Sequence, residues 1–446
     1  MDLEDILGRT PLEQRISRRI FLRNTALTAA AGLVAASCGP YTLAAGNGTP
    51  LTYWNLFSGG DGLRMNQMVS DFAGSQSDIA VNSVTLTWGA PYYTKLAMAA
   101  VGGQPPDVAI MHLSRMLGYA PAGLLQPFDE AQLAQYGITA DKFLPEIWNS
   151  AHFGGKLYAI PLDTHPFVMY YNTDICRKAG LLGADGKLVP LVGPNAVIAA
   201  FQKVQKATGA LGLALDVQDV NPWRLFYALY SQLGGNILTP DGSKLVLDDA
   251  KALQALSFMT DLTLKAKVAT PTTDYGGAVA LFASGKAGFF WNGEWEVTTF
   301  QDAKLPFNMT LFPNIFGNNK TQADSHTFIL PKPSVLDPQR LADSLKFISF
   351  MLKDSAVWAQ GGHIPAYQPV IKSAAYQKLE PQANYAAEAQ YVVYDPPAWF
   401  SGSGSQMETQ AGAAFQAVMG GQITAQQGLD QYRSYMQKML NTPSPV

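Results

Sequence analysis

The chain has 446 residues and a net charge of −3, from 31 Lys and Arg against 34 Asp and Glu. Hydrophobic residues make up 48%, aromatic residues 11% and charged residues 15%, a composition that excludes an intrinsically disordered chain. The flat charge balance excludes the electrostatic footprint of a nucleic-acid-binding protein.

The N-terminal segment has the features of an export signal. Residues 17–22, Ser-Arg-Arg-Ile-Phe-Leu, resemble the twin-arginine motif. The apolar stretch 25–37 that follows is long enough for a signal core but too short for a permanent membrane span. A buried amphipathic helix is the alternative interpretation.

A lipid attachment site is expected at the end of this signal. Small residues lead into Cys38, as in a bacterial lipobox, although Ala35 stands where that motif usually has Leu. We expect residues 1–38 to be a twin-arginine lipoprotein signal, Cys38 to be lipidated, and residues 39–50 to be a flexible tether. With only two cysteines in the chain, no disulfide framework is expected.

From residue 51 the sequence alternates between strand and helix patterns. Residues 51–55 predict a strand, and a helix follows from Asp61 with apolar residues every three or four positions. A second strand is expected over 84–88, a second helix from Pro91 and a third strand over 107–111. This order predicts a mostly parallel sheet with helices on both faces.

The alternation continues along the chain. Further strands are expected at 157–160, 167–171, 211–215 and 287–291. Further helices are expected from Pro194, from Trp223, over 249–267 and after Pro338. Because a mature chain of this length exceeds one comfortable core, we expect two α/β lobes.

Four motifs follow one another in a fixed order. They are 104–111 with 118–128, 155–162 with 170–181, 282–288 with 292–295, and 361–366. Together they resemble the extracellular solute-binding proteins (family 1) of ABC importers, a group that includes maltose- and oligosaccharide-binding proteins. The second motif, Gly-Lys-Leu-Tyr-Ala-Ile-Pro-Leu running into Tyr-Tyr-Asn-Thr-Asp, is the most specific.

The resemblance implies a periplasmic-binding-protein-like type II fold, in which two α/β lobes flank a ligand cleft. Carried over, it places residues 51–160 and 285–335 in lobe one, and residues 161–284 and 336–446 in lobe two. It implies a lipoprotein that captures a mono- or oligosaccharide and delivers it to the permease of an ABC importer. Such a protein is expected to be a monomer without cofactor or enzymatic activity, anchored on the outer face of the bacterial cytoplasmic membrane.

Candidate cleft residues lie where strands end or where the chain crosses between lobes. They are Ser58, Gly60, Asp61, His112, Ser114, Asp163, His165, Trp223, Arg224, Asn292, Gly293, Glu294, Trp295, His326 and His363. Asp163, at the first crossing, is expected to accept sugar hydroxyls, and Trp295 to stack on a sugar ring. Trp223 is explained equally well as a core residue, and Asp61 as a helix N-cap.

No enzyme or metal signature is present. The sequence has no HExxH motif and no P-loop, and its five histidines show no metal-ligand spacing. One alternative ligand is a glycerophosphodiester or other phosphorylated polyol, held by Arg115, Arg224 and the glycine turn at 59–60. A remote alternative is an exported glycoside hydrolase with Asp163 and Glu294 as its carboxylate pair.

Overall fold

The computed structural model describes residues 41–43 and 50–444. The expected signal at 1–38, with Cys38, lies outside the described residues. The architecture below is that of residues 42–446, one of the two units into which the chain divides. Within the described part of the chain, no helix combines the length and apolar character needed to cross a membrane.

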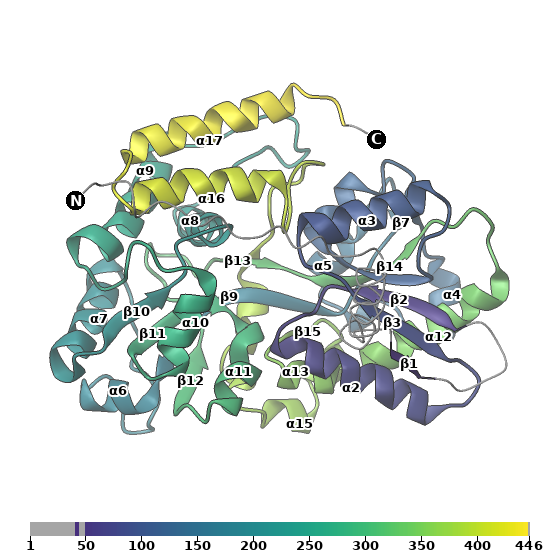
Figure 1. Cartoon of the computed structure of the whole chain (residues 1–446), viewed down its shortest axis with the longest axis horizontal. Helices are drawn as coiled ribbons and strands as arrows, with labels where there is room; N and C mark the ends of the chain where they lie inside the picture. Colours follow the sequence, from purple (N-terminus) through teal and green to yellow (C-terminus); the bar gives the residue numbers. More distant parts are fainter. Residues whose placement is uncertain (1–40, 44–49, 445–446) are drawn as a thin grey trace, which may run out of the picture. The chain divides into compact units, whose positions relative to one another are not determined.

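The first lobe is built on a mixed sheet in the order β3-β2-β4-β14-β5, with β8 also paired to β14 (Figure 1). Its strands are β2 (Leu51–Asn55), β3 (Val81–Thr85), β4 (Val108–His112), β5 (Leu125–Gln126), β8 (Ile160–Pro161) and β14 (His326–Pro331). Strands β3, β2 and β4 run parallel, and β14 returns antiparallel to β4. The short β1 (Tyr41–Leu43) comes earlier in the chain, and β6 (His152–Phe153) pairs with β7 (Lys156–Leu157).

The second lobe has its own sheet, in the order β10-β11-β9-β13-β16, with β12 and β15 also paired to β9. Its strands are β9 (Asp163–Asn172), β10 (Leu211–Leu215), β11 (Ala287–Gly293), β12 (Phe307–Thr310), β13 (Thr321–Asp324), β15 (Ile364–Pro365) and β16 (Val392–Val393). All ten residues of β9 are buried, and the strand contacts four others along its length.

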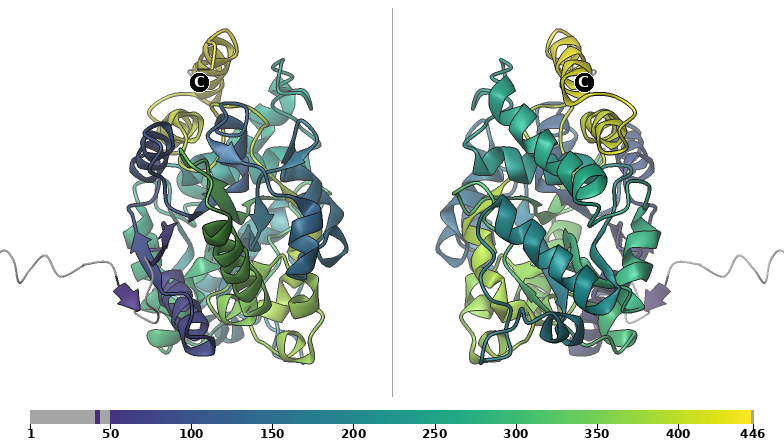
Figure 2. Two further views of the ribbon diagram at one scale, coloured as in Figure 1. Left: turned by 90° about the vertical axis from the view of Figure 1, so that its right-hand side faces the viewer. Right: turned by 90° about the vertical axis from the view of Figure 1, so that its left-hand side faces the viewer.

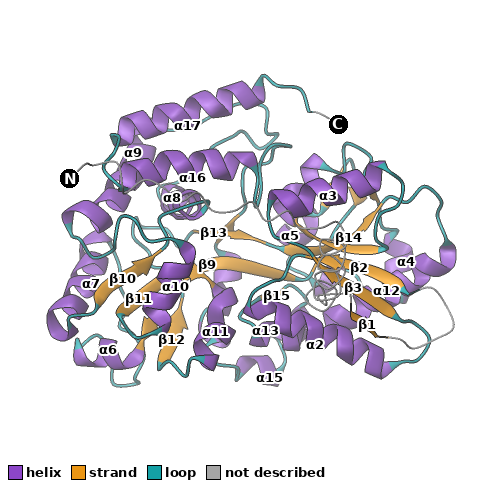
Figure 3. Ribbon diagram, in the orientation of Figure 1, coloured by secondary structure: helices purple, strands orange, loops and turns teal. Residues whose placement is uncertain are grey.

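Helices flank both sheets, as Figure 3 shows. Those of the N-terminal half are α2 (Gly60–Ser75), α3 (Ala90–Val101), α4 (Glu130–Gln135), α5 (Pro145–Ser150), α6 (Thr173–Lys178), α7 (Pro194–Thr208) and α8 (Asn221–Gln232). The later ones are α9 (Asp249–Thr260), α10 (Tyr275–Ala283), α11 (Val297–Asp302), α12 (Pro338–Lys353), α13 (Ser355–Gln360), α14 (Gln368–Ile371), α15 (Ala374–Gln377), α16 (Gln406–Met419) and α17 (Ala425–Leu440). Helices α16 and α17 lie side by side in both views of Figure 2 and pack against α8 and α9.

The helices form where the sequence repeats apolar residues at helical spacing. In α7, Val197, Phe201 and Val204 are buried on one face, and Gly209 ends the helix in the left-handed region at φ 70°. In α2 the same spacing buries Met65 and Phe72 in the first core. Burying one such side chain contributes roughly 2 kcal/mol of hydrophobic stabilisation, so these faces fix each helix against its sheet.

Predicted element bounds differ from the structure at several places, among them two beside the cavity. The alternating pattern predicts a strand over 84–88, but β3 ends at Thr85 and Gly89, at φ 87°, turns the chain into α3. Trp88 is therefore a loop residue. Helix α2 begins before Asp61, and its N-cap is Gly59, which makes no side-chain cap.

The segments of the two lobes also differ from the expected ranges. Of residues 285–335, β11, β12 and β13 join the second sheet, and only β14 joins the first. Helices α12 and α13, within the range 336–446, pack against α2 and bury Leu345 and Trp358 in the first core. The ranges differ because strands pair with partners that are distant in sequence: β11 is hydrogen-bonded between β10 and β9.

The chain crosses between the two sheets through short connections. Leu162 alone separates β8 from β9, and Ser325 alone separates β13 from β14. A third connection runs from α13 in the first lobe to β15, which pairs with the start of β9. Because β9, β13 and β15 are neighbours there, residues distant in sequence meet at these crossings.

Candidate functional site

A cavity of about 320 Å³ lies between the two lobes. Its wall consists of Leu56, Ser58, Gly59, Asp61, Trp88, His112, His165, Asp216, Asp219, Val220, Asn221, Arg224, Tyr275, Trp295, Glu296, His326 and His363. Most of these residues follow the carboxyl ends of parallel strands, which is where ligands bind in open α/β sheets.

The first lobe supplies the loops after β2, β3 and β4. Ser58 and Asp61 follow β2, Trp88 follows β3, and His112 is the last residue of β4. Tyr93 fixes the ring of His112: its hydroxyl accepts the His112 backbone N–H at 3.0 Å and lies 2.6 Å from Nδ1. These two contacts fix the orientation of the His112 ring at the cavity.

The second lobe supplies the residues after β10 and β11. Asp216 follows β10 and accepts hydrogen bonds from the Gln218 backbone and the Asn221 amide. Trp295 follows β11, and its indole N–H donates to the Tyr275 hydroxyl at 2.7 Å. The Tyr275 hydroxyl in turn donates to Glu296 and accepts from the Asn292 amide.

Arg224 on α8 lies between tryptophans of the two lobes. Its guanidinium carbon is 5.7 Å from the ring centroid of Trp88 and 5.5 Å from that of Trp295. Cations near aromatic faces are attracted to the ring electrons. On its other side, Arg224 Nε is 3.9 Å from Glu408 Oε1. We call Trp88, Arg224 and Trp295 the tryptophan–arginine stack.

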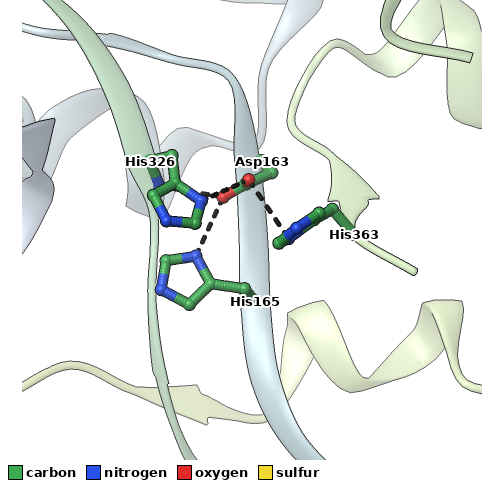
Figure 4. Close-up of side chains that lie close together, drawn as sticks. All are labelled: Asp163, His165, His326 and His363. Carbon is green, nitrogen blue, oxygen red and sulfur yellow. Dashed lines mark hydrogen bonds and ion pairs between the residues drawn. The ribbon is translucent and has the colours of Figure 1, made fainter. Parts of the chain in front are cut away.

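Four residues from the crossings meet beside the cavity (Figure 4). Asp163 and His165 come from the start of β9, His326 from the start of β14, and His363 precedes β15. We call these four residues the crossing cluster.

Asp163 is the centre of this cluster. Its Oδ1 accepts from the His326 backbone N–H at 2.8 Å and lies 3.0 Å from His165 Nδ1. Its Oδ2 lies 2.7 Å from His326 Nδ1 and accepts from the Trp358 indole N–H at 2.7 Å. Burial alone would raise the pKa of Asp163, but His326 and His165 outweigh it and hold the pKa well below its usual range.

His363 is the fourth member and lies against a second carboxyl. Its ring stacks on Trp358 at 4.1 Å, and its Nδ1 is 3.4 Å from Asp163 Oδ2 and 3.1 Å from Glu294 Oε1. Both His363 and Glu294 are 0% exposed. Burial, followed by repulsion from Asp163 and Asp61, raises the pKa of Glu294 well above its usual range.

The cavity acids and imidazoles titrate away from their ordinary ranges because they are buried. Burial raises the pKa of Asp216 to about 7 and that of Asp61 to about 6. Burial lowers the pKa of His165 to about 4, and burial with repulsion from the other imidazoles lowers that of His112 well below its usual range. His112 and His165 are therefore neutral at pH 7.

The structure brings together about half of the sequence-predicted site residues. Those that line the cavity are Ser58, Asp61, His112, His165, Arg224, Trp295, His326 and His363. Those that do not are Gly60, Ser114, Asp163, Trp223, Asn292, Gly293 and Glu294.

The residues that miss the cavity do so for identifiable reasons. Trp223 is 0% exposed, stacks on Tyr227 and donates to Asp395, so the core interpretation fits it. Ser114 donates to Asp324 instead. Asp163 is fully buried and its oxygens accept from protein donors, so it orients the histidines from behind the cavity wall.

Sequence reasoning missed Leu56, Trp88, Asp216, Asp219, Val220, Asn221, Tyr275 and Glu296. Trp88 was not recognised as a loop residue, because the strand-like alternation of apolar and polar residues continues through it. Asp216 and Asn221 follow a predicted strand, and the rule that ligands bind beyond strand ends could have found them. Sequence reasoning also did not show that four of the five histidines meet at the cavity, because they converge only through strand pairing.

The cavity does not favour either alternative function. Arg115 lies over the Tyr93 ring at 4.5 Å and is not part of the wall, which contains four carboxyl side chains and Arg224. Such a wall repels a phosphorylated ligand. Asp163 and Glu294 also lie behind the wall, so they do not flank a bond in the cavity as a hydrolase pair does.

The sequence matches a model of the bacterial extracellular solute-binding proteins over residues 58–358. A curated relative, the arabinooligosaccharide-binding protein of Bacillus subtilis, is 28% identical over 52% of this chain and 51% of its own length. The maltotriose-binding protein of Pyrococcus abyssi is 25% identical over 50% and 46%. The chain thus spans about half the length of these relatives.

Solved structures share the fold. The GacH receptor of Streptomyces glaucescens, solved unliganded and with acarbose, has a TM-score of 0.75 at 19% identity and covers 90% of this chain and 100% of its own. An ABC substrate-binding protein of Listeria monocytogenes in complex with cycloalternan has a TM-score of 0.74 at 21% identity, covering 89% and 100%. At these identities the likeness concerns the two-lobe α/β architecture.

Proposed function

Because the chain belongs to the bacterial extracellular solute-binding protein family, we propose that it captures a carbohydrate between its lobes and delivers it to the permease of an ABC importer. The ligand is a mono- or oligosaccharide, and the protein acts as a monomer that binds its ligand without altering it. The names of the relatives, which bind arabino-oligosaccharide and maltotriose, support this class of ligand.

The observation that carries the proposal is the make-up of the cavity wall. Trp88 and Trp295 come from opposite lobes, and both are half-buried. Aromatic rings suit the apolar C–H faces of sugar rings. Asp61, Asp216 and Glu296 supply carboxylate oxygens between them, and such oxygens accept hydrogen bonds from hydroxyl groups strongly.

Capture occurs by closure of the lobes around the sugar. The ligand contacts both walls in the closed state, so it shifts the population toward closure by its differential affinity. The moving bodies are residues 51–161 with 326–362, and residues 163–324 with 364–365 and 392–440. The contact residues in this proposal are those of the cavity wall, and Asp163 and Glu294 act from behind it.

We extend the proposal to export and anchoring. The signal at 1–38 directs the folded chain through the twin-arginine pathway, and lipid on Cys38 holds it on the outer face of the cytoplasmic membrane. Replacement of both Arg18 and Arg19 by Lys should leave the precursor inside the cell. Cys38→Ala should abolish labelling by a radioactive fatty acid; labelling that persists would contradict the anchor.

Isothermal titration calorimetry tests the binding function. The full chain is titrated with arabino- and malto-oligosaccharides and their monosaccharides, and at least one should bind in the micromolar range or tighter. Trp88→Ala should weaken that binding at least tenfold, since a buried aromatic contact is worth about 2 kcal/mol.

The matched control is Trp54→Ala, because Trp54 is also half-buried and lies on β2, the strand beside β3, but outside the cavity wall. It should leave affinity unchanged. The absence of heat with every sugar, or equal losses in the two variants, would refute the proposed function.

A further inference from the structure

The crossing cluster has the composition and geometry of a metal site. Asp163, His165, His326 and His363 are all buried, and each offers one ligand atom within 4.8 Å of the others. Figure 4 shows the imidazoles arranged around the Asp163 carboxylate. Three imidazoles and one carboxylate are a donor set that zinc and similar divalent ions prefer.

Hydrogen bonding satisfies only part of the cluster. Nδ1 of His165 and of His326 each pair with an Asp163 oxygen. Neither ring nitrogen of His363 and neither oxygen of Glu294 makes a hydrogen bond within the described part of the chain, although all four atoms are buried. Unpaired buried polar atoms are rare in native proteins because each costs desolvation energy.

Within the described residues, neither Asp163 nor Glu294 forms an ion pair with Lys or Arg. Glu294 Oε1 and Asp163 Oδ2 both lie close to His363 Nδ1, at 3.1 and 3.4 Å. Both carboxyl groups are buried, and the guanidinium of the cavity wall, Arg224, is engaged with the tryptophans and Glu408. A cation among these atoms would satisfy the carboxylates and His363 together.

We propose that the crossing cluster binds a divalent transition-metal ion of the zinc type, with Asp163, His165, His326 and His363 as ligands and Glu294 beside it. Coordination through Nδ1 requires that nitrogen to carry no hydrogen, so the hydrogen of a coordinated ring lies on Nε2. The metal site goes beyond the sugar-binding function, since Asp163 and Glu294 lie outside the cavity wall.

The position of the ligands gives the ion a structural effect. Its ligands lie at three separate crossings between the lobes: at the start of β9, at the start of β14 and just before β15. An ion that binds only the folded chain stabilises it by mass action. At a saturating concentration we expect the thermal midpoint to rise by about 5 °C.

The test uses the full chain purified without a histidine tag. After chelator treatment and dialysis against Zn²⁺, elemental analysis should find one ion per chain, and the thermal midpoint should rise. Co²⁺ should give the visible absorption of a tetrahedral site. Ca²⁺, which prefers oxygen ligands, should do neither.

Variants separate this site from adventitious binding. His165→Gln and His363→Gln should each lose the ion and the thermal shift, whereas His152→Gln should keep both. His152 is the matched control, because it is the one histidine of the sequence outside the cavity and lies 3.6 Å from Glu130.

Two results would overturn the proposal. One is less than stoichiometric Zn²⁺ on the unaltered chain without a thermal shift. The other is the same uptake and shift in the His165 and His363 variants as in the unaltered chain. If these variants fail to fold, the stoichiometry and the Co²⁺ spectrum of the unaltered chain still decide the question. Neither measurement involves sugar, so failure here leaves the proposed function standing.

Discussion

The tryptophan–arginine stack and the crossing cluster border the same cavity but are held in place differently. Trp88, Arg224 and Trp295 come from loops and a helix of opposite lobes. The guanidinium carbon of Arg224 lies 5.7 Å from the ring centroid of Trp88 and 5.5 Å from that of Trp295. The crossing cluster comes from strand ends, is buried, and is fixed by hydrogen bonds to one carboxylate. The stack depends on how the lobes meet, whereas the cluster helps to join them. Changes to the cluster should therefore appear as lost stability, and changes to the stack as lost affinity.

Asp163→Asn is expected to have the largest effect. The amide places N–H groups where Asp163 now accepts hydrogen bonds from His326 and Trp358. Removing one partner of such a buried network costs about 3–5 kcal/mol. Urea denaturation of the unaltered and variant chains measures the difference.

The control for this variant is Asp174→Asn, which breaks an exposed ion pair with Arg177. Exposed pairs contribute about 0–1 kcal/mol, so this change should barely alter the free energy of unfolding. Equal losses in the two variants would mean that the crossing cluster does not join the lobes as described.

Asp216 gives a pH-dependent effect on the stack side of the cavity. Its pKa of about 7 when folded lies above the unfolded value of 3.8. The folded chain then binds the proton more tightly, so the unaltered chain loses stability as the pH rises from 4 toward 7. Relative to Asp216→Asn, this loss should reach about 2 kcal/mol between pH 5 and pH 7, since each pKa unit corresponds to about 1.4 kcal/mol.

Denaturation series of the two chains at several pH values measure this loss. The exposed Asp185→Asn serves as the reference for a carboxyl outside the cavity. Parallel pH profiles for the unaltered and Asp216→Asn chains would show that burial does not perturb Asp216.

Trp295→Ala tests the affinity side of the comparison. Removing the ring should cost about 2 kcal/mol of sugar binding, or roughly thirtyfold in Kd, with little change in stability. The paired variant is Trp223→Phe, a change in the buried core that should lower stability by about 1–3 kcal/mol and leave affinity unchanged. For both variants, calorimetry measures the sugar affinity and urea denaturation measures the free energy of unfolding. A stability loss in Trp295→Ala with an affinity loss in Trp223→Phe would contradict the comparison.

Arg224→Lys should have the smallest effect. The lysine ammonium keeps the charge near Glu408 but lacks the guanidinium group that lies near the Trp88 and Trp295 rings. We expect a loss of about 0.5–1 kcal/mol in sugar affinity, measured by calorimetry at constant ionic strength. A loss as large as that of Trp295→Ala would mean that Arg224 itself contacts the ligand.

Local patterns in the sequence predicted the fold class and the faces of α2 and α7, because helical spacing decides burial within one element. The same spacing made Trp223 ambiguous, since a core residue and a cavity residue can occupy one helix face. The crossing cluster could not be predicted. His165, His326 and His363 are distant in sequence, and only the pairing of β9 with β13 and β15 brings them together.

The single residues Leu162 and Ser325, which connect strands of the two sheets, have a consequence for the entropy of ligand capture. One residue between two strands adds only two soft backbone dihedrals. Ordering a residue costs about 1–2 kcal/mol of conformational free energy, so connections this short leave little freedom to be lost when the lobes close. More of the gross contact energy of a captured solute is then retained as net affinity.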